Sequence, residues 1–179
     1  LKLTKEKPCS ICGVFRRYIL NTKAKKLGVT KLATGHNLDD EAQTVLMNQF
    51  RRNMAASLKL GPITGVIKDE KFIRRIKPLY FMTEREVATF AFINNLKDDY
   101  KECPNNEESY RCYIRDKLNE IEEKFPGTKH SIITSFLETL PLIRKNYNIK
   151  KIKACKLCSE PCSQETCQAC KMAEKIKLL

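Results

Sequence analysis

The C-terminal segment of the chain contains a set of cysteines whose spacing most constrains how it folds. In "CKLCSEPCSQETCQAC", Cys155 and Cys158 form one CxxC pair and Cys167 and Cys170 form another, with eight residues between the pairs. Two tight turns of this kind can present four thiolates tetrahedrally, which is the geometry of structural zinc sites. So short a segment has no other core in which to bury four cysteines. The spacing therefore predicts a small zinc-binding module over residues 151–179.

The remaining composition favours one main body, over residues 1–150, in a reducing compartment. The chain has 179 residues and nine cysteines, an odd number that suits metal binding better than a secreted disulfide framework. It has no run of about 20 apolar residues and no signal-peptide pattern near its start. We therefore expect a cytoplasmic protein. Because the chain begins at Leu1 and not at Met, we also expect a fragment.

A second group of cysteines leaves several interpretations open. Cys9 and Cys12 form a CxxC pair in "PCSICGVFRR" with no second CxxC nearby, and the further partner we consider is Cys103, on a distant loop. A structural zinc site prefers four protein ligands, whereas an iron–sulfur cluster held by three cysteines leaves one iron open. The residues alone allow a metal or cluster site, a redox disulfide, or unlinked cysteines. Cys112 is interpreted as a core residue and Cys162 as a spare cysteine.

The net charge of the chain indicates a polyanionic partner. Lysine and arginine number 34 against 21 acidic residues, which gives a formal charge of +13. Nucleic acid is the leading candidate because a basic face attracts polyanions and releases counterions, although a merely solvated surface is the alternative. Paired arginines are the first candidates for RNA contact: Arg16, Arg17, Arg51, Arg52, Arg74 and Arg75.

The stretch "VTKLATGHNLDDEAQTVLMNQF" predicts a strand, a turn and a helix. Gly35 and His36 follow the strand, and the adjacent carboxylates Asp39 and Asp40 follow the turn. Ligands bind at this end of a strand in α/β sheets, where a helix N-terminus offers free N–H groups to a phosphate, so a nucleotide or its magnesium fits here. The alternatives are a solvated turn histidine and an aspartate favoured by the helix dipole.

Capping and helix-ending residues predict further helices along the chain. Gly28 predicts the end of a helix that begins near Cys12, and "TERE" predicts a capping box between Thr83 and Glu86. The other expected elements are a strand from Arg74 to Pro78 and helices over Tyr110–Lys124 and Thr128–Arg144, the second kinked at Pro141.

Taken together, six segments resemble the tRNA 2-thiolation proteins of the PP-loop ATPase superfamily, the 2-thiouridine synthetases of TtuA type and their archaeal and eukaryotic cytoplasmic relatives. The segments are "PCSICGVFRR", "LATGHNLDDEAQT", "RRIKPLYFMTEREVATFA", "KECP", "YRCYIRDKLNEIE" and the terminal double CxxC. The resemblance implies an α/β fold: the C-terminal part of a doubly wound PP-loop domain, of the adenine nucleotide alpha hydrolase type, with a helical extension and a C-terminal zinc ribbon.

The resemblance also implies the site residues and the reaction. Cys9, Cys12 and Cys103 would hold a 4Fe-4S cluster whose free iron binds hydrosulfide. The residues that would lie against ATP with its magnesium are Gly35, His36, Asp39 and Asp40. ATP would adenylylate the C2 oxygen of a tRNA uridine, and sulfur would then displace AMP. A persulfide on Cys9 or Cys12 is an alternative route, and a non-catalytic zinc-dependent RNA-binding module is an alternative function.

Two further expectations concern what accompanies this chain. Family members commonly pair with a ubiquitin-like sulfur carrier and form homodimers. The family's phosphate-binding PP-loop and an N-terminal zinc module should precede Leu1. On that basis we expect this chain alone to bind ATP poorly and to be inactive.

Overall fold

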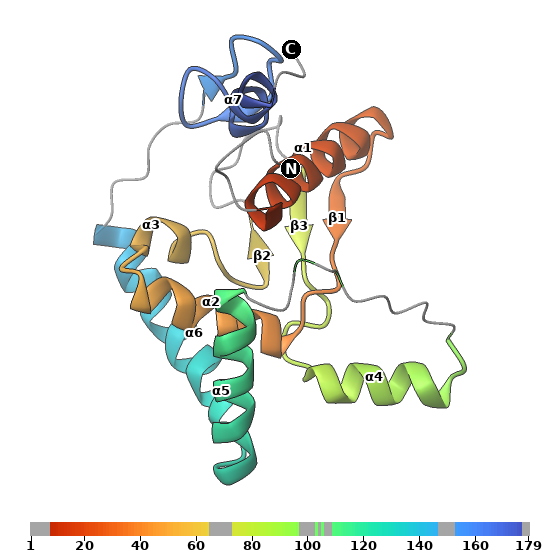
Figure 1. The fold of residues 1–179 in the computed structure, drawn as a ribbon, viewed down its shortest axis with the longest axis vertical. Coiled ribbons are helices and arrows are strands. Elements are labelled where there is room, and N and C mark those ends of the chain that lie inside the picture. The colour runs from red at the N-terminus through yellow and green to blue at the C-terminus, as the bar shows by residue number, and fades with distance from the viewer. Residues whose placement is uncertain are drawn as a thin grey trace. The chain divides into compact units, whose positions relative to one another are not determined.

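The computed structural model describes residues 8–64, 73–96, 103, 105, 109–146 and 153–176 (Figure 1). The chain separates into two compact units that alternate along the sequence. The first unit consists of Leu1–Leu32, Gly65–Arg75 and Ile149–Leu179, and the second of Ala33–Thr64 and Ile76–Asn148. The C-terminal cysteine module therefore belongs to the same unit as the N-terminal CxxC helix. The predicted boundary near residue 150 stays a prediction.

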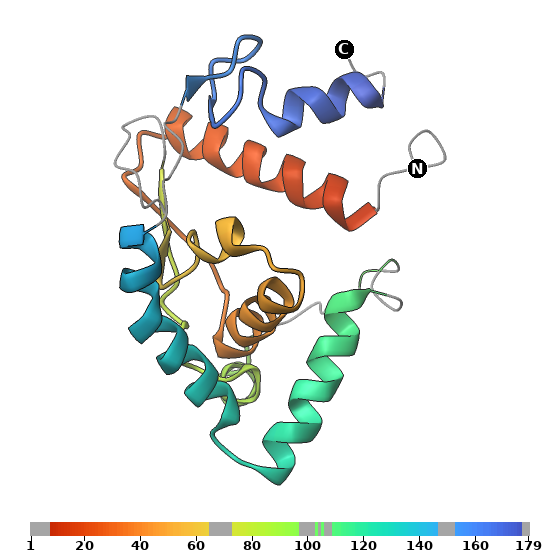
Figure 2. The same ribbon diagram turned by 90° about the vertical axis from the view of Figure 1, so that its left-hand side faces the viewer.

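The first unit combines one long helix with the C-terminal module. Its elements are α1 (Pro8–Lys26), β4 (Lys153–Ala154), β5 (Pro161–Cys162) and α7 (Gln168–Lys175). β4 and β5 form an antiparallel hairpin that pairs Lys153 with Cys162 and Ala154 with Pro161. Figure 2 shows α7 beside α1, and the two helices are in contact.

Helix α1 begins earlier than the sequence indicated and ends where it indicated. Its first residue is Pro8, which suits the first helical position because proline lacks the N–H that a helix start leaves unpaired. Cys9 and Cys12 therefore lie on the first turn, not ahead of the helix. At the other end Gly28 has φ +65°, and the N–H groups of Gly28 and Val29 bond back to Lys25 and Ala24. This hydrogen-bond pattern is a Schellman motif.

Three short strands form one sheet. They are β1 (Lys31–Ala33), β2 (Ile63–Thr64) and β3 (Arg74–Ile76), in the order β1-β3-β2. The N–H of Thr34 donates to the carbonyl of Ile76 at 3.0 Å, which extends the β1–β3 pairing by one residue. The chain leaves β1 at this point and enters the loop of residues 34–37, called the motif loop below, which leads to α2.

The second unit is mainly helical. Its helices are α2 (Leu38–Phe50), α3 (Met54–Ser57), α4 (Glu84–Ile93), α5 (Tyr110–Lys124) and α6 (Thr128–Asn146). α2, α5 and α6 pack against one another, as Figure 1 shows. Their core contains Leu38, Ala42, Val45, Tyr80, Leu118, Ile133, Phe136 and Leu140.

Local capping explains where these helices start. Asn37 accepts the N–H of Asp40 at the start of α2, and Ser109 accepts that of Cys112 at the start of α5. The capping box between Thr83 and Glu86 at α4 is present, which confirms that prediction. Cys112 is buried, as expected for a core residue. Helix α6 continues through Pro141 to Asn146.

None of the described helices combines the length and the apolar character that a membrane span needs. Helix α4 differs from the other helices of its unit because none of its residues is buried. Phe90, Phe92 and Ile93 are more than half exposed. The stability of α4 therefore rests on its capping box and on its attachment at Glu84, which belongs to the site described next.

Candidate functional site

The loop between β1 and α2 presents the predicted nucleotide motif at the start of a helix. Gly35 and His36 are exposed, and a Cβ added to Gly35 would meet no other atom within 4 Å. His36 Nδ1 lies 3.0 Å from Thr34 Oγ1. Asn37 caps the helix by accepting the N–H of Asp40 at 3.0 Å, and the N–H of Leu38 donates to the carbonyl of Met82 at 2.8 Å. These N–H groups are therefore not free for a phosphate, which corrects the expectation of free donors at the start of this helix.

The two adjacent aspartates of the motif have different environments. Asp39 is only 4% exposed, and each of its carboxylate oxygens accepts a hydrogen bond from the protein. Oδ1 accepts from the Lys129 ammonium group of α6, and Oδ2 accepts from the backbone N–H of Glu84 at 2.7 Å. Asp39 thus joins α2 to the starts of α4 and α6. Its carboxylate is engaged in holding the unit together.

Asp40, in contrast, keeps a partly open carboxylate. Its side chain is 40% exposed, and Oδ1 lies 3.7 Å from Arg111 Nη1 of α5. Arg111 also donates to Gln43 Oε1 at 3.1 Å and to Thr44 Oγ1 at 3.0 Å. The guanidinium group is therefore fixed along one face of α2, with Asp40 beside it. Of the two aspartates, Asp40 is the one whose carboxylate is accessible to a ligand.

A second buried ion pair lies behind the motif. Lys77 Nζ donates to Glu41 Oε1 at 2.7 Å, and both side chains are less than 10% exposed. Glu41 Oε2 and the Tyr80 hydroxyl are buried without a hydrogen-bond partner among the described residues. Burial, followed by the nearby Glu41 charge, raises the pKa of Tyr80 well above its usual value. Tyr80 therefore stays neutral next to this pair.

Sequence reasoning missed the three basic residues that organise the motif. Lys77, Lys129 and Arg111 each pair with an acidic residue of the first turn of α2. Lys129 is separated from Asp39 by 90 positions in the sequence. No local pattern marks such a partner. "YRCYIRDKL" contains Arg111, but its spacing alone does not show which way the side chain points.

The four cysteines of the double CxxC come together as the spacing predicts. The Sγ atoms of Cys155, Cys158, Cys167 and Cys170 all lie within 4.8 Å of one another. This is the one group of three or more potential metal ligands found among the described residues. Cys162 stays outside the group, and its Sγ donates to the carbonyl of Gln164. The arrangement can hold one metal ion with four sulfur ligands.

The backbone around this group is arranged to receive thiolates. The N–H of Cys167 donates to Cys155 Sγ at 3.2 Å, and the N–H of Cys170 donates to Cys167 Sγ at 3.4 Å. Burial opposes ionisation of Cys155, but the N–H groups of Cys167, Cys158 and Leu157 outweigh it and lower the pKa of this thiol to about 6. Burial raises the pKa of the Cys170 thiol. One thiolate is thus favoured by the protein alone, and a cation would stabilise the others.

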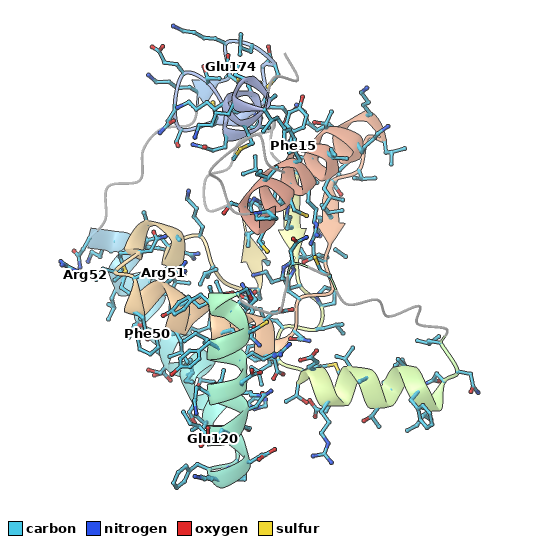
Figure 3. All side chains as sticks on the ribbon, in the orientation of Figure 1. Phe15, Phe50, Arg51, Arg52, Glu120 and Glu174 are labelled. Carbon is cyan, nitrogen blue, oxygen red and sulfur yellow. The ribbon has the colours of Figure 1, made fainter. Side chains whose placement is uncertain are left out.

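The cysteine group is packed against helix α1. Val14, Phe15 and Tyr18 of α1 contact its buried side, and Figure 3 shows Phe15 on the helix. Glu160 adds polar links, because it accepts from Asn21 Nδ2 at 2.6 Å and from Lys25 Nζ at 3.2 Å. The module therefore supports the helix whose first turn carries the other CxxC pair.

That pair is exposed. Cys9 and Cys12 lie one turn apart on α1, and Arg16 Nη2 donates to Cys12 Sγ at 3.2 Å. Cys103 is also exposed but belongs to the second unit. The structure thus leaves all three predicted cluster ligands accessible, and their meeting at one cluster stays a prediction.

The predicted RNA-binding arginines differ in their surroundings. Arg16, Arg17, Arg51, Arg52 and Arg74 are exposed. Arg75 is partly buried, and its Nη2 donates to the carbonyl of Arg17 at 3.4 Å. Burial, followed by the charge of Arg17, lowers the pKa of the Arg75 guanidinium from its usual value. Arg75 is therefore the least available of the six for an RNA phosphate.

Comparison with known families decides how this arrangement is classified. The family model for the PP-loop domain matches residues 13–122, more than half of the chain. The chain belongs to the PP-loop domain family.

This match corrects one expectation. We expected the PP-loop part of the protein to lie before Leu1, yet residues 13–122 match the PP-loop domain itself. The expectation depended on the lack of a glycine- and serine-rich loop ahead of the first strand. The match instead covers α1 from Gly13 onward, the motif loop, α2 and most of α5. The expectation of poor ATP binding and inactivity depended on the same absence and loses its basis.

Individual relatives of this PP-loop domain share one kind of name. The chain is 41% identical over 168 residues to the tRNA-5-methyluridine(54) 2-sulfurtransferase of Pyrococcus horikoshii. The match covers 94% of this chain and 54% of that protein. It is 36% identical over 174 residues to cytoplasmic tRNA 2-thiolation protein 1 of Caenorhabditis elegans. That match covers 97% of this chain and 45% of the relative. These similarities support the resemblance seen in the motifs.

A solved structure shares the fold. The U34-tRNA thiolase NcsA from Methanococcus maripaludis, described with its 4Fe-4S cluster, matches with a TM-score of 0.77 and 34% sequence identity. The match covers 95% of this chain and 53% of that one. The chain spans about half the length of the curated relatives it matches. The PP-loop ATPase-like α/β fold is therefore confirmed for this chain.

The pairing of Asp39 with Lys129 gives a stability prediction. Lys129→Met leaves a buried carboxylate without its cation, so we expect the free energy of unfolding to fall by about 3–5 kcal/mol. Urea denaturation measures this loss. Lys124→Met is the matched control, since Lys124 is exposed and its pair with Glu120 spans 3.9 Å; it should change stability by less than about 0.5 kcal/mol. Equal effects of both variants would contradict the anchoring role of Asp39.

Proposed function

We propose that this PP-loop domain takes part in ATP-dependent tRNA thiolation, the replacement of the C2 oxygen of a tRNA uridine by sulfur. The observation that carries the proposal is the match to tRNA thiolases along almost the whole chain, 94% of it for one relative and 95% for the solved structure. The uridine differs among these relatives, since one is named for position 54 and another for U34.

The motif loop is the proposed ATP side of the site. Gly35 leaves open space, and His36 is exposed beside it. Asp40 has the accessible carboxylate, so we assign to it the contact with ATP or its magnesium, with Arg111 keeping the side chain in place. Asp39 does not contact ATP in this proposal; it fixes the first turn of α2 through Lys129 and the N–H of Glu84. ATP then activates the C2 oxygen as an adenylate with release of pyrophosphate.

Cys9, Cys12 and Cys103 are the proposed ligands of the 4Fe-4S cluster. All three are exposed, so their thiols are accessible to an incoming cluster, and Arg16 supplies a cation next to Cys12 Sγ. When bound, such a cluster with one iron free of protein ligands supplies a place for hydrosulfide. Sulfur attacks the activated C2 carbon, and AMP leaves with the original oxygen. Residues that hold the sulfur source near that carbon raise its effective concentration.

The C-terminal cysteine group is proposed to bind zinc. Four thiols with no carboxylate or imidazole among them match the all-cysteine type of structural zinc site. The site is closed because the protein supplies all four ligands. Its proposed role is to hold the module in the shape that supports α1 through Val14, Phe15 and Tyr18.

Partners and location complete the proposal. The net charge of +13 suits tRNA, and the exposed arginines offer phosphate contacts. A ubiquitin-like sulfur carrier and a homodimer are proposed from the resemblance. A cytoplasmic location is proposed, with the name of the Caenorhabditis elegans relative as its support.

Thiolation and the cluster are tested together through Cys103. We expect the protein, expressed anaerobically from its complete gene, to form 2-thiouridine in a tRNA transcript when given ATP, magnesium and sulfide. Cys103→Ala should abolish both the thiolated nucleoside, measured by mass spectrometry, and the broad iron–sulfur absorbance. Cys112→Ala, which changes a core cysteine of the same unit, should keep both.

Other results would favour the alternatives. A protein without iron that carries a persulfide on Cys9 or Cys12 would support the persulfide route. Salt-sensitive tRNA binding without any ATP-dependent thiolation would support a non-catalytic RNA-binding module. Full activity of Cys103→Ala would refute the cluster proposal.

Zinc is tested by elemental analysis. We expect about one zinc ion per chain at the C-terminal site. Cys167→Ser should lose it, because the remaining three sulfurs leave the tetrahedral site incomplete. Cys162→Ser is the matched control from the same module and should retain the metal. If both variants keep zinc, the four-cysteine assignment is wrong.

The different roles of the two aspartates give a further prediction. Asp40→Asn should lower the rate of thiolation at limiting ATP by about 10²-fold, because a misplaced nucleotide reacts slowly, while the unfolding midpoint stays the same. Asp39→Asn should lower the unfolding midpoint, because the buried Lys129 charge loses its partner. Activity and thermal melts of both variants check this. A stable but inactive Asp39→Asn variant would reverse the two assignments.

A further inference from the structure

Helix α2 ends in an unusual way. Arg52 has φ +52°, in the left-handed region that side chains other than glycine rarely adopt. Its N–H donates to the carbonyl of Gln49 at 3.0 Å, and that of Asn53 donates to the carbonyl of Asn48 at 2.8 Å. This is the same Schellman pattern that Gly28 makes at the end of α1. Arginine therefore occupies a position that glycine fills more easily.

The side chain of Arg52 has no evident structural use. It is exposed, and neither Arg51 nor Arg52 forms an ion pair with a described residue. The left-handed backbone at Arg52 costs free energy, and no described ion pair of its side chain offsets that cost. Such a conformation points to a function for the side chain.

A cavity lies next to this arginine. Its volume is about 370 Å³, and it is lined by Asn48, Gln49, Arg52, Met54 and Ser57. Asn48 Nδ2 is buried and has no hydrogen-bond partner among the described residues, so an occupant with an acceptor would complete it. The volume falls within the usual range of ligand sites and exceeds that of one nucleobase.

Further aromatic and cationic side chains lie at the same end of α2, outside the lining of the cavity. Figure 3 shows Phe50, Arg51 and Arg52 together at the end of α2. Phe50 is 65% exposed, and the Arg51 guanidinium lies 4.1 Å from the centre of the Tyr110 ring. Unpaired RNA bases stack on aromatic rings and guanidinium planes, while amide side chains hydrogen-bond to their edges. A phosphate alone would not make use of Met54 or of the exposed ring.

We propose that this cavity binds one unpaired nucleotide of an RNA, with the base against Arg52 and the amides of Asn48 and Gln49. The proposal rests on the tRNA substrate of the proposed function, and it adds a base-binding site at the C-terminal end of α2, away from the motif loop at its start. Arg51 and Tyr110 then offer a second surface for a neighbouring base or phosphate.

The test separates binding from stability. Arg52→Gly relieves the backbone, so the melting temperature should stay the same or rise by up to about 3 °C. The same variant should bind a fluorescent RNA hairpin with an unpaired loop about tenfold more weakly. Its affinity for a fully paired RNA duplex of the same length should fall only about twofold, through the lost charge. Arg52→Lys should keep the duplex affinity and lose part of the hairpin affinity.

Arg52→Gly changes two things at once: it relaxes the backbone at a helix end, and it removes one exposed positive charge. One control variant reproduces each change separately. Asn95→Gly alters the same helix-end motif, at φ +49° after α4, and should leave RNA binding unchanged. Arg85→Gln removes an exposed charge elsewhere in the unit and should weaken hairpin and duplex equally.

Three results would overturn the proposal. Unchanged hairpin affinity in Arg52→Gly, or equal losses for hairpin and duplex, would exclude base recognition in the cavity. A lower melting temperature would show that Arg52 is structural. If the parent protein bound neither RNA, the RNA substrate of the proposed function would fail as well, whereas hairpin binding that ignores Arg52 would refute the cavity alone.

Discussion

The ion pair between Asp39 and Lys129 is the interaction on which the rest of the second unit depends. Asp39 is the second residue of α2, and its two oxygens reach α6 through Lys129 and the start of α4 through the N–H of Glu84. A buried carboxylate is tolerated only when such partners replace its hydration. The pair therefore fixes how α2 enters the core. That in turn determines where the neighbouring Asp40 carboxylate meets solvent.

The sequence revealed the local part of this design. The capping box at Thr83 and the helix end at Gly28 were predictable because their partners lie within a few residues. The four-cysteine group was predictable because its spacing alone brings the thiols together. Lys129 and Arg111 were not, since their roles depend on how α5 and α6 pack on α2. Asp39 and Asp40 are adjacent in the sequence, yet only the packing shows that one is buried and the other accessible.

The two cysteine sites are linked by structure as well as by chemistry. The buried side of the C-terminal group packs on α1, and Glu160 is hydrogen-bonded to Asn21, whose Oδ1 accepts the N–H of Ile73. A module this small has little core of its own, so a metal ion would contribute much of its stability. On the proposal that this group binds zinc, the metal would help to hold α1 in place, and with it the first turn that carries Cys9 and Cys12.

The net positive charge alone does not show which arginines are available to a ligand, because that depends on the surroundings of each side chain. Arg75 is committed to the carbonyl of Arg17, and Arg51 lies over the Tyr110 ring. Arg52 alone among the six keeps its side chain exposed from a left-handed backbone position. Electrostatic attraction needs no particular backbone, since any exposed arginine supplies the charge. On our proposal, the cation is held where glycine would be easier because it recognises a shape, and the adjoining cavity would receive a flat base with an edge for hydrogen bonds.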